Sequence, residues 1–209
     1  MKIEASSLDA TQAYKLLSGI VVPRPVAWIT TRTSPTVVNL APFSCFTFVS
    51  SNPPMVGFNI GEKASGLKDT AANVAANREY VVNIADETMI EKVHKSSAEF
   101  PSDRSETDAL GIATVPSVHV DCPRLRDVPI SLECRFDSVT QFGRGKSQFI
   151  VGEIVCFHIR DDLYKNGKID TANLRPICRI AGPNYAMLGQ IITQTALGNF
   201  GPPGTAENW

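Results

Sequence analysis

Residues 24–85 decide the fold, and they read RPVAWITTRTSPTVVNLAPFSCFTFVSSNPPMVGFNIGEKASGLKDTAANVAANREYVVNIA. Short apolar runs recur along this stretch, and each is bounded by Pro, Ser, Asn or Gly. This pattern predicts β-strands at residues 26–31, 37–40, 46–49, 55–60 and 80–84. Before the last strand, residues 68–78 are rich in Ala and Asn with apolar side chains at helical spacing, which predicts one helix.

The sequence after this segment extends the β-rich pattern. Apolar and polar side chains alternate along residues 130–137, as in a strand with one buried face. Residues 147–159 are apolar on both faces, which is typical of a long central or bent strand. Gly143 and Gly145 between these runs predict a hairpin tip. With about six or seven strands and few helices, the sequence predicts a mainly β fold, a barrel rather than a doubly wound sheet.

Two further helices and one loop are expected outside this β-rich part. Asp9 can cap a helix whose apolar residues repeat at i, i+3, i+4 and i+7 along residues 10–17, with Gly19 at its end. Residues 86–95 place acids first and bases last, as the helix macrodipole favours. Residues 100–108 are polar and rich in helix breakers, so we expect a surface loop there.

Composition excludes several classes of protein. The chain has 209 residues, a hydrophobic share of 43% and a charged share of 20%, which suits a globular domain. The net charge of −1 lacks the basic footprint of a nucleic-acid binder. No apolar run is long enough to span a membrane, and the first residues lack the apolar stretch of a secretory signal. We therefore expect no nucleic acid, no membrane and a cytoplasmic location.

Neither a metal site nor a catalytic triad is expected from the sequence. The five cysteines form no CxxC pair, and we expect reduced core thiols. The histidines His94, His119 and His158 are isolated, and His158 lies in an apolar strand, as a satisfied core or pocket histidine does. The cluster His119-x-Asp121-Cys122 is not favoured as a ligand set. Nucleophile-elbow, P-loop and dinucleotide fingerprints are missing, and the sequence identifies no catalytic residue.

What remains is a constellation suited to an anionic, flat ligand. Residues 39–46 interrupt a strand with Ala-Pro and then Ser, small residues that let the backbone approach a ligand. Lys68, Asp69 and Thr70 stand at a helix start, where free N–H groups and a lysine favour a phosphate. Residues 59–63 follow a strand, with Gly61 giving room. From these residues alone, a phosphate site and an ordinary helix start with nearby turns both remain open.

The order and spacing of these motifs resemble the flavin reductase-like family with its FMN-binding split barrel. The residues that carry the resemblance are 24–31, 39–44, 53–56, 68–73 and 80–83, followed less sharply by 132–134, 151–155 and 179–185. It implies a six-stranded split β-barrel with accessory helices, a homodimer, and one FMN per subunit near the interface. One departure from the family is the segment 32–36, which replaces a Gly-containing hairpin turn.

Position by position, the resemblance implies a set of FMN-binding residues. Thr30 would lie near the cofactor, and Tyr185 would approach the ring or substrate side. The residues along the isoalloxazine and ribityl chain would be Asn39, Ala41, Pro42, Ser44 and Cys45. The residues at the phosphate end would be Asn59, Gly61, Lys63, Lys68, Asp69 and Thr70.

The function implied is an NAD(P)H-dependent flavin oxidoreductase, in which hydride passes to flavin N5 and electrons then pass to free flavin, a partner oxygenase or another small acceptor. A non-enzymatic, flavoredoxin-like FMN electron carrier is the alternative. A pyridoxamine-phosphate-oxidase-like enzyme and a barrel scaffold without cofactor also remain open. We expect the domain at residues 1–188 and a C-terminal tail at 189–209. That tail is either a frayed terminus or an arm that lays Phe200 and Trp209 on a neighbouring subunit.

Overall fold

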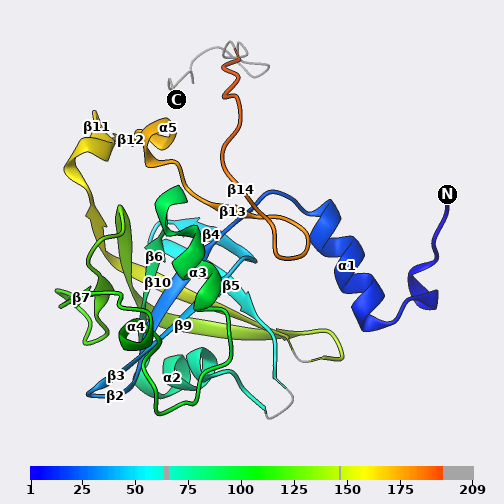
Figure 1. Ribbon diagram of the computed structural model, residues 1–209, viewed down its shortest axis with the longest axis horizontal. Coiled ribbons are helices and arrows are strands. Elements are labelled where there is room, and N and C mark those ends of the chain that lie inside the picture. The colour runs from blue at the N-terminus through cyan, green and yellow to red at the C-terminus, as the bar shows by residue number, and fades with distance from the viewer. Residues whose placement is uncertain (64–65, 146, 195–209) are drawn as a thin grey trace.

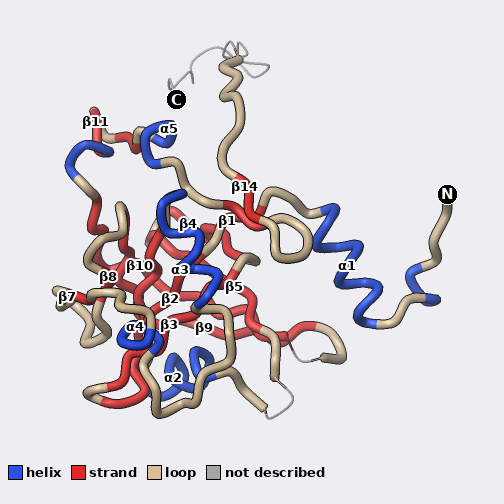
Figure 2. The backbone as a smooth tube through the Cα atoms, in the orientation of Figure 1, coloured by secondary structure: helices blue, strands red, loops and turns tan. Residues whose placement is uncertain are grey.

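The computed structural model describes residues 1–63, 66–145 and 147–194. Its centre is a seven-stranded antiparallel sheet with the strand order β3-β2-β6-β9-β10-β5-β4 (Figures 1 and 2). The strands are β2 Ala27–Ser34, β3 Val37–Phe43, β4 Phe46–Ser51, β5 Pro54–Ile60, β6 Glu79–Ile84, β9 Ile130–Phe142 and β10 Ser147–Ile159. The predicted mainly β fold is confirmed, and every predicted strand is present.

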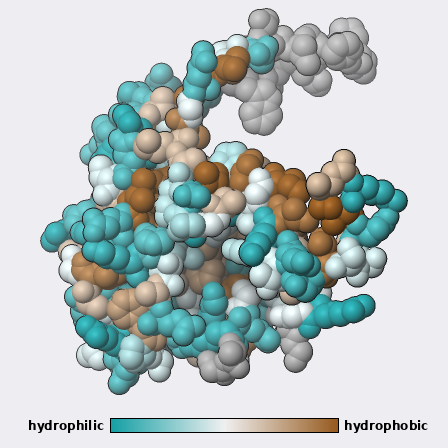
Figure 3. All heavy atoms as spheres, turned by 45° about the vertical axis from the view of Figure 1, so that its right-hand side comes forward, coloured by the Kyte–Doolittle hydropathy of each residue, from teal (hydrophilic) through white to brown (hydrophobic). Residues whose placement is uncertain are grey.

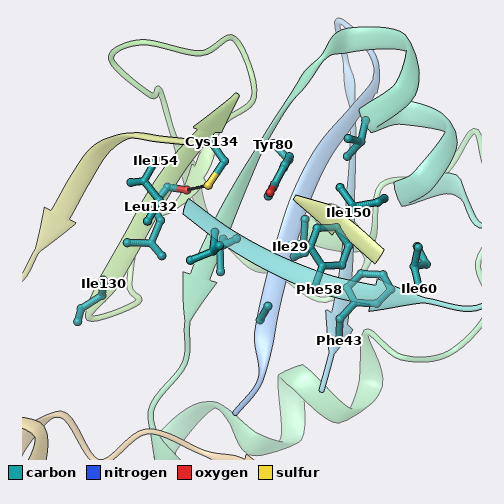
Figure 4. Packing of buried hydrophobic residues seen from close by; sticks show 14 of the residues in the cluster. Ile29, Phe43, Phe58, Ile60, Tyr80, Ile130, Leu132, Cys134, Ile150 and Ile154 are labelled. Carbon is teal, nitrogen blue, oxygen red and sulfur yellow. Dashed lines mark hydrogen bonds between the residues drawn. The ribbon is translucent and has the colours of Figure 1, made fainter. Parts of the chain in front are cut away.

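The sheet curls on itself around one apolar core. β3 pairs with β2, and β5 pairs with β10 and β4, yet Phe43 of β3 packs on Phe58 of β5 with ring centroids 5.1 Å apart. Tyr80 of β6 meets Phe58 edge to face at 5.5 Å, and Figure 4 shows these rings among Ile29, Ile60 and Ile150. Strands from both sides of the sheet thus bury their inner faces against each other. This is the split β-barrel that the resemblance implies, with seven strands in the sheet instead of the expected six.

Two glycines make room for large side chains, Gly152 for Tyr80 inside this core and Gly57 for Phe149 outside it. A Cβ on Gly152 of β10 would collide with the Tyr80 hydroxyl and would lie 2.8 Å from the Arg135 carbonyl oxygen. A Cβ on Gly57 of β5 would lie 2.5 Å from the Phe149 ring. The β9–β10 ladder shifts register between Val151 and Gly152, so the strand bends where the glycine admits Tyr80.

Helices and short strands surround the barrel. The helices are α1 Ala10–Ile20, α2 Asp69–Asn77, α3 Ile90–Lys95, α4 Glu106–Ala109 and α5 Thr171–Leu174, with 3₁₀ turns at Ala5–Ser7, Glu87–Met89 and Asp161–Leu163. The short strands are β1 Arg24–Pro25, β7 Thr114–Val115, β8 Arg124–Leu125, β11 Tyr164–Lys165, β12 Lys168–Ile169, β13 Cys178–Arg179 and β14 Tyr185–Ala186.

The predicted helices are present with small differences. Asp9 caps α1 in a reciprocal capping box with Gln12, and the helix continues past Gly19 to Ile20. The expected surface loop at residues 100–108 contains the start of α4, capped by Ser105. Phe200 and Trp209 lie outside the described residues, so the two alternatives for the tail stay predictions. Among the described residues, no helix is long and apolar enough to cross a membrane.

Candidate functional site

A pocket of about 210 Å³ opens where β3, the start of α2 and the segment after α3 meet. Of the residues predicted from the sequence, it is lined by Asn39, Ala41, Pro42, Lys63, Lys68, Asp69 and Thr70. Residues that the sequence did not indicate also line it: Phe43, Ser96, Ser97, Ala98, Glu99, Phe100 and Glu106. The structure therefore brings more than half of the predicted set into one concavity.

A buried amide network joins the floor of the pocket to α2. The Asn39 side-chain amide donates to the hydroxyls of Thr70 (3.0 Å) and Thr31 (3.1 Å). The Asn73 amide, one helical turn beyond Thr70, donates to the same Thr31 hydroxyl at 3.0 Å. Since all four residues are buried, these bonds fix the first turn of α2 against β3.

The first turn of α2 gives the pocket a positive end. Its N-cap residue Lys68 has extended backbone and offers no side-chain cap, so the positive helix terminus is left to water or to a ligand. The Lys63 ammonium lies 3.2 Å from the Asp69 carboxylate. The Lys68 ammonium lies 6.0 Å from the Phe43 ring centroid and forms no ion pair among the described residues. Lys68 is therefore the cation available to an anion at this helix end.

A buried carboxyl, Glu106, forms part of the pocket wall. It accepts a hydrogen bond from the Leu40 N–H at 3.0 Å, and β3 is an edge strand, so Glu106 satisfies a strand donor that no neighbouring strand reaches. Burial raises the pKa of Glu106, and the nearby Asp69 carboxylate raises it further. The pocket thus carries two lysines, Lys63 and Lys68, beside three carboxyl groups, those of Asp69, Glu99 and Glu106.

A second group of predicted residues lies where β3 turns into β4. Ser44 and Cys45 form this turn, and the Asn59 N–H donates to the Cys45 carbonyl at 2.8 Å. Asn59 and Gly61 stand at the end of β5, and a Cβ on Gly61 would meet no atom within 4 Å. The Cys45 thiol is exposed. This group does not line the pocket itself.

The remaining predicted residues, Thr30 and Tyr185, lie elsewhere. Thr30 is fully buried and donates to the Pro123 carbonyl at 2.7 Å. Tyr185 of β14 packs its ring against the Arg179 guanidinium (4.7 Å to the centroid) and the His94 ring. Neither lines the pocket in the single chain, so their proposed roles toward a cofactor stay predictions.

The pocket residues in segment 96–100, which the sequence did not indicate, are placed there by a long-range contact. The Trp28 indole N–H donates to the Ser96 hydroxyl at 2.8 Å, and this bond holds the start of segment 96–100 beside the barrel. A polar stretch after a short helix carries no local sign of such a bond. Only the position of Trp28, buried in β2, could have suggested a fixed neighbour for its N–H.

The split barrel and the lysine-bearing pocket at its rim define a class of flavin-associated proteins. The chain belongs to the flavin reductase-like family, because residues 18–173 match the model of the flavin reductase like domain. It is 40% identical over 196 residues to the uncharacterized protein BH2278 of Halalkalibacterium halodurans, covering 91% of this chain and 93% of the relative.

Two solved structures with more than 30% identity have the same fold. Nitrilotriacetate monooxygenase component B from Bacillus cereus aligns with a TM-score of 0.89 and 32% identity, over 93% of this chain and 98% of that one. The 2-nitrobenzoate 2-nitroreductase NbaA of Pseudomonas fluorescens aligns with a TM-score of 0.82 and 31% identity, over 98% and 100%. The family match and these two structures together support a flavin-associated protein.

Proposed function

We propose that the protein binds FMN and acts as an NAD(P)H-dependent flavin oxidoreductase. The observation that carries the proposal is the pocket at the start of α2, where an uncapped helix terminus and Lys68 face a wall made by β3. Membership of the flavin reductase-like family supports a flavin, and the helix terminus with its lysine favours a terminal phosphate, as FMN has.

The residues present fit FMN, with one group of residues for its phosphate and another for its ring system. The α2 terminus, Lys68 and Lys63 would hold the phosphate, with Thr70 positioned by Asn39. The pocket volume of about 210 Å³ is below the roughly 300 Å³ at which sites for whole drug-sized ligands begin. The ring system therefore has to extend beyond it, past Ala41 and Pro42 toward the turn at Ser44 and Cys45. When bound, FMN would supply the hydride-accepting chemistry, and the protein would supply orientation and backbone N–H groups.

Two measurements test this function. Fluorescence titration of the protein with FMN should show saturable binding, and a protein that takes up no FMN would exclude the proposal. Anaerobic mixing of the loaded protein with NADH or NADPH should then bleach the visible flavin band rapidly. Binding without bleaching would instead support the non-enzymatic electron carrier.

Lys68→Ala should weaken FMN binding by about 1–2 kcal/mol, or about 5- to 30-fold in Kd, if its ammonium contacts the phosphate. Riboflavin, which lacks the phosphate, should lose little affinity in the same variant. Lys165→Ala is the matched control, because this exposed lysine pairs with Asp170 near α5 and lies outside the pocket. Equal loss for FMN and riboflavin, or unchanged FMN affinity, would reject the phosphate contact.

We also propose that the protein is a homodimer, because the apolar face of α1 is exposed in the part of the chain that the structure describes. Tyr14, Leu17 and Ile20 are 69%, 61% and 72% exposed, and apolar side chains gather on the side of the molecule that carries α1 (Figure 3). Exposed Phe48 of β4 and Met187 after β14 add further apolar surface. Such a surface is expected to be buried in an interface.

Replacing both Leu17 and Ile20 with glutamate should convert the dimer to a monomer in sedimentation equilibrium, since charges would be buried without partners. Glutamate at the exposed, polar positions Thr11 and Lys15 of α1 is the control and should leave the mass unchanged. A wild-type protein of monomer mass would refute the dimer.

A further inference from the structure

A cluster of three potential metal ligands lies on the outer face of the barrel, away from the pocket lining. Glu133 of β9 pairs across the sheet with Cys156 of β10, and His158 follows two residues later on the same strand. Residues two apart in a strand share a face. One donor atom from each of the three side chains lies within 4.8 Å of the other two.

The donor set is one that zinc uses in proteins. Zn²⁺ binds thiolate sulfur, imidazole nitrogen and carboxylate oxygen at about 2.0–2.3 Å, so tetrahedral ligand atoms stand about 3.3–3.6 Å apart. The His158 Nε2 and Glu133 Oε1 atoms are 2.5 Å apart, and the whole set lies within 4.8 Å. Opening the contact between His158 and Glu133 by about 1 Å would bring these two donors to zinc spacing.

Glu133 is already oriented by the backbone. Its Oε1 accepts the Val118 N–H and its Oε2 accepts the His119 N–H, each at 2.7 Å. The side chain is fully buried. A carboxylate held in place by two backbone N–H donors is oriented in the way that second-shell contacts orient a metal ligand.

The other two ligands are reachable from solvent. Cys156 is partly buried and His158 is 21% exposed. His158 lines an open pocket of about 570 Å³ beside the strand ends. Of the three side chains only that of His158 lines this pocket, so solvent would reach the fourth position of a bound metal from the His158 side.

We infer that Glu133, Cys156 and His158 form a binding site for Zn²⁺ or a similar borderline divalent cation, with water in the fourth position. Binding replaces the hydrogen bond between His158 and Glu133 by two bonds to the metal, so the ring proton on His158 Nε2 passes to Nδ1 or to solvent, and the thiol proton of Cys156 is released to solvent. The site is independent of the proposed flavin chemistry, and none of its residues lines the flavin pocket.

Cobalt spectroscopy on the full chain tests the inference. The protein is freed of metal with a chelator and titrated with Co²⁺, whose visible bands in a four-coordinate site lie to the red of flavin absorption. We expect these bands, a thiolate charge-transfer band, one Co²⁺ per chain, and displacement by Zn²⁺. Cys156→Ser should abolish the charge-transfer band, and His158→Gln should weaken Co²⁺ binding by about 10- to 100-fold or more.

His119→Gln is the matched control, because His119 contacts Glu133 through its backbone N–H and its side chain is exposed. It should bind Co²⁺ as the wild type does. Thermal melting in chelator checks that each variant is folded. Absence of four-coordinate bands in the wild type, a spectrum unchanged by both ligand substitutions, or an equal loss in the His119→Gln control would each overturn the site and leave Glu133 and His158 as an ion pair only.

Discussion

Gly152→Ala should destabilise the protein by about 3 kcal/mol, at the upper end of the range for overpacking a core. The new methyl group would collide with the Tyr80 hydroxyl and with the Arg135 carbonyl oxygen. Tyr80 is fully buried against Phe58, and the carbonyl belongs to the paired strand β9, so neither neighbour can move far. The strain that the new methyl group causes would therefore fall inside the barrel rather than at its surface.

Urea unfolding followed by far-UV circular dichroism measures this effect. Gly145→Ala in the turn of the same hairpin is the control, because its new methyl group would meet no atom within 4 Å, and it should change stability by less than about 0.5 kcal/mol. Tyr80→Phe should rescue part of the loss, since it removes one colliding atom whose hydroxyl has no hydrogen-bond partner among the described residues. Equal stability of Gly152→Ala and Gly145→Ala would contradict the packing of Tyr80.

The strands could be predicted because their signal is local. Alternation along residues 130–137 predicted one buried face, and Ile130, Leu132 and Cys134 do lie in the core. Ser131 and Glu133 on the opposite face are buried as well, which the alternation did not predict. Strand β9 continues to Phe142 through exposed residues, because β10 supplies it with hydrogen bonds. The local sequence pattern gives no sign of these bonds. Helix α4 was missed for the same reason. Its four residues include Glu106, which binds the Leu40 N–H of β3.

The candidate site likewise has one part that local sequence patterns predict and another part that depends on long-range contacts. Residues 39–42 and 68–70 were predicted because a strand interruption and a helix start are local features, and the resemblance set them in order. The structure brings them together through Asn39 and Thr70. The wall at residues 96–100 depends on the Trp28–Ser96 bond between distant segments. The proposed metal site could not be predicted either, because Glu133 and His158 are far apart in sequence and only the β9–β10 register makes them neighbours.

Glu133→Gln should cost about 3–5 kcal/mol at neutral pH, measured in chelator so that metal has no part in it. The two carboxylate oxygens face the N–H groups of Val118 and His119, and Oε1 also meets His158. In glutamine one of these positions becomes an amide NH₂, which would point a donor at a donor in a fully buried place. Glu153→Gln, an exposed carboxylate on β10, is the control and should change stability by less than about 0.5 kcal/mol.

The pH dependence separates loss of this charge from a general packing defect. Because the pKa of Glu133 is lower in the folded protein than its usual 4.5, the unfolded chain binds the proton more tightly. The carboxylate therefore contributes its full stability above about pH 4.5 and loses it as the pH falls through the folded-state pKa. The stability gap between wild type and Glu133→Gln should be constant near neutrality and narrow in acid, where the protonated wild-type side chain resembles the amide. A gap that stays constant throughout the acid range would show that packing, rather than the buried carboxylate, accounts for the loss.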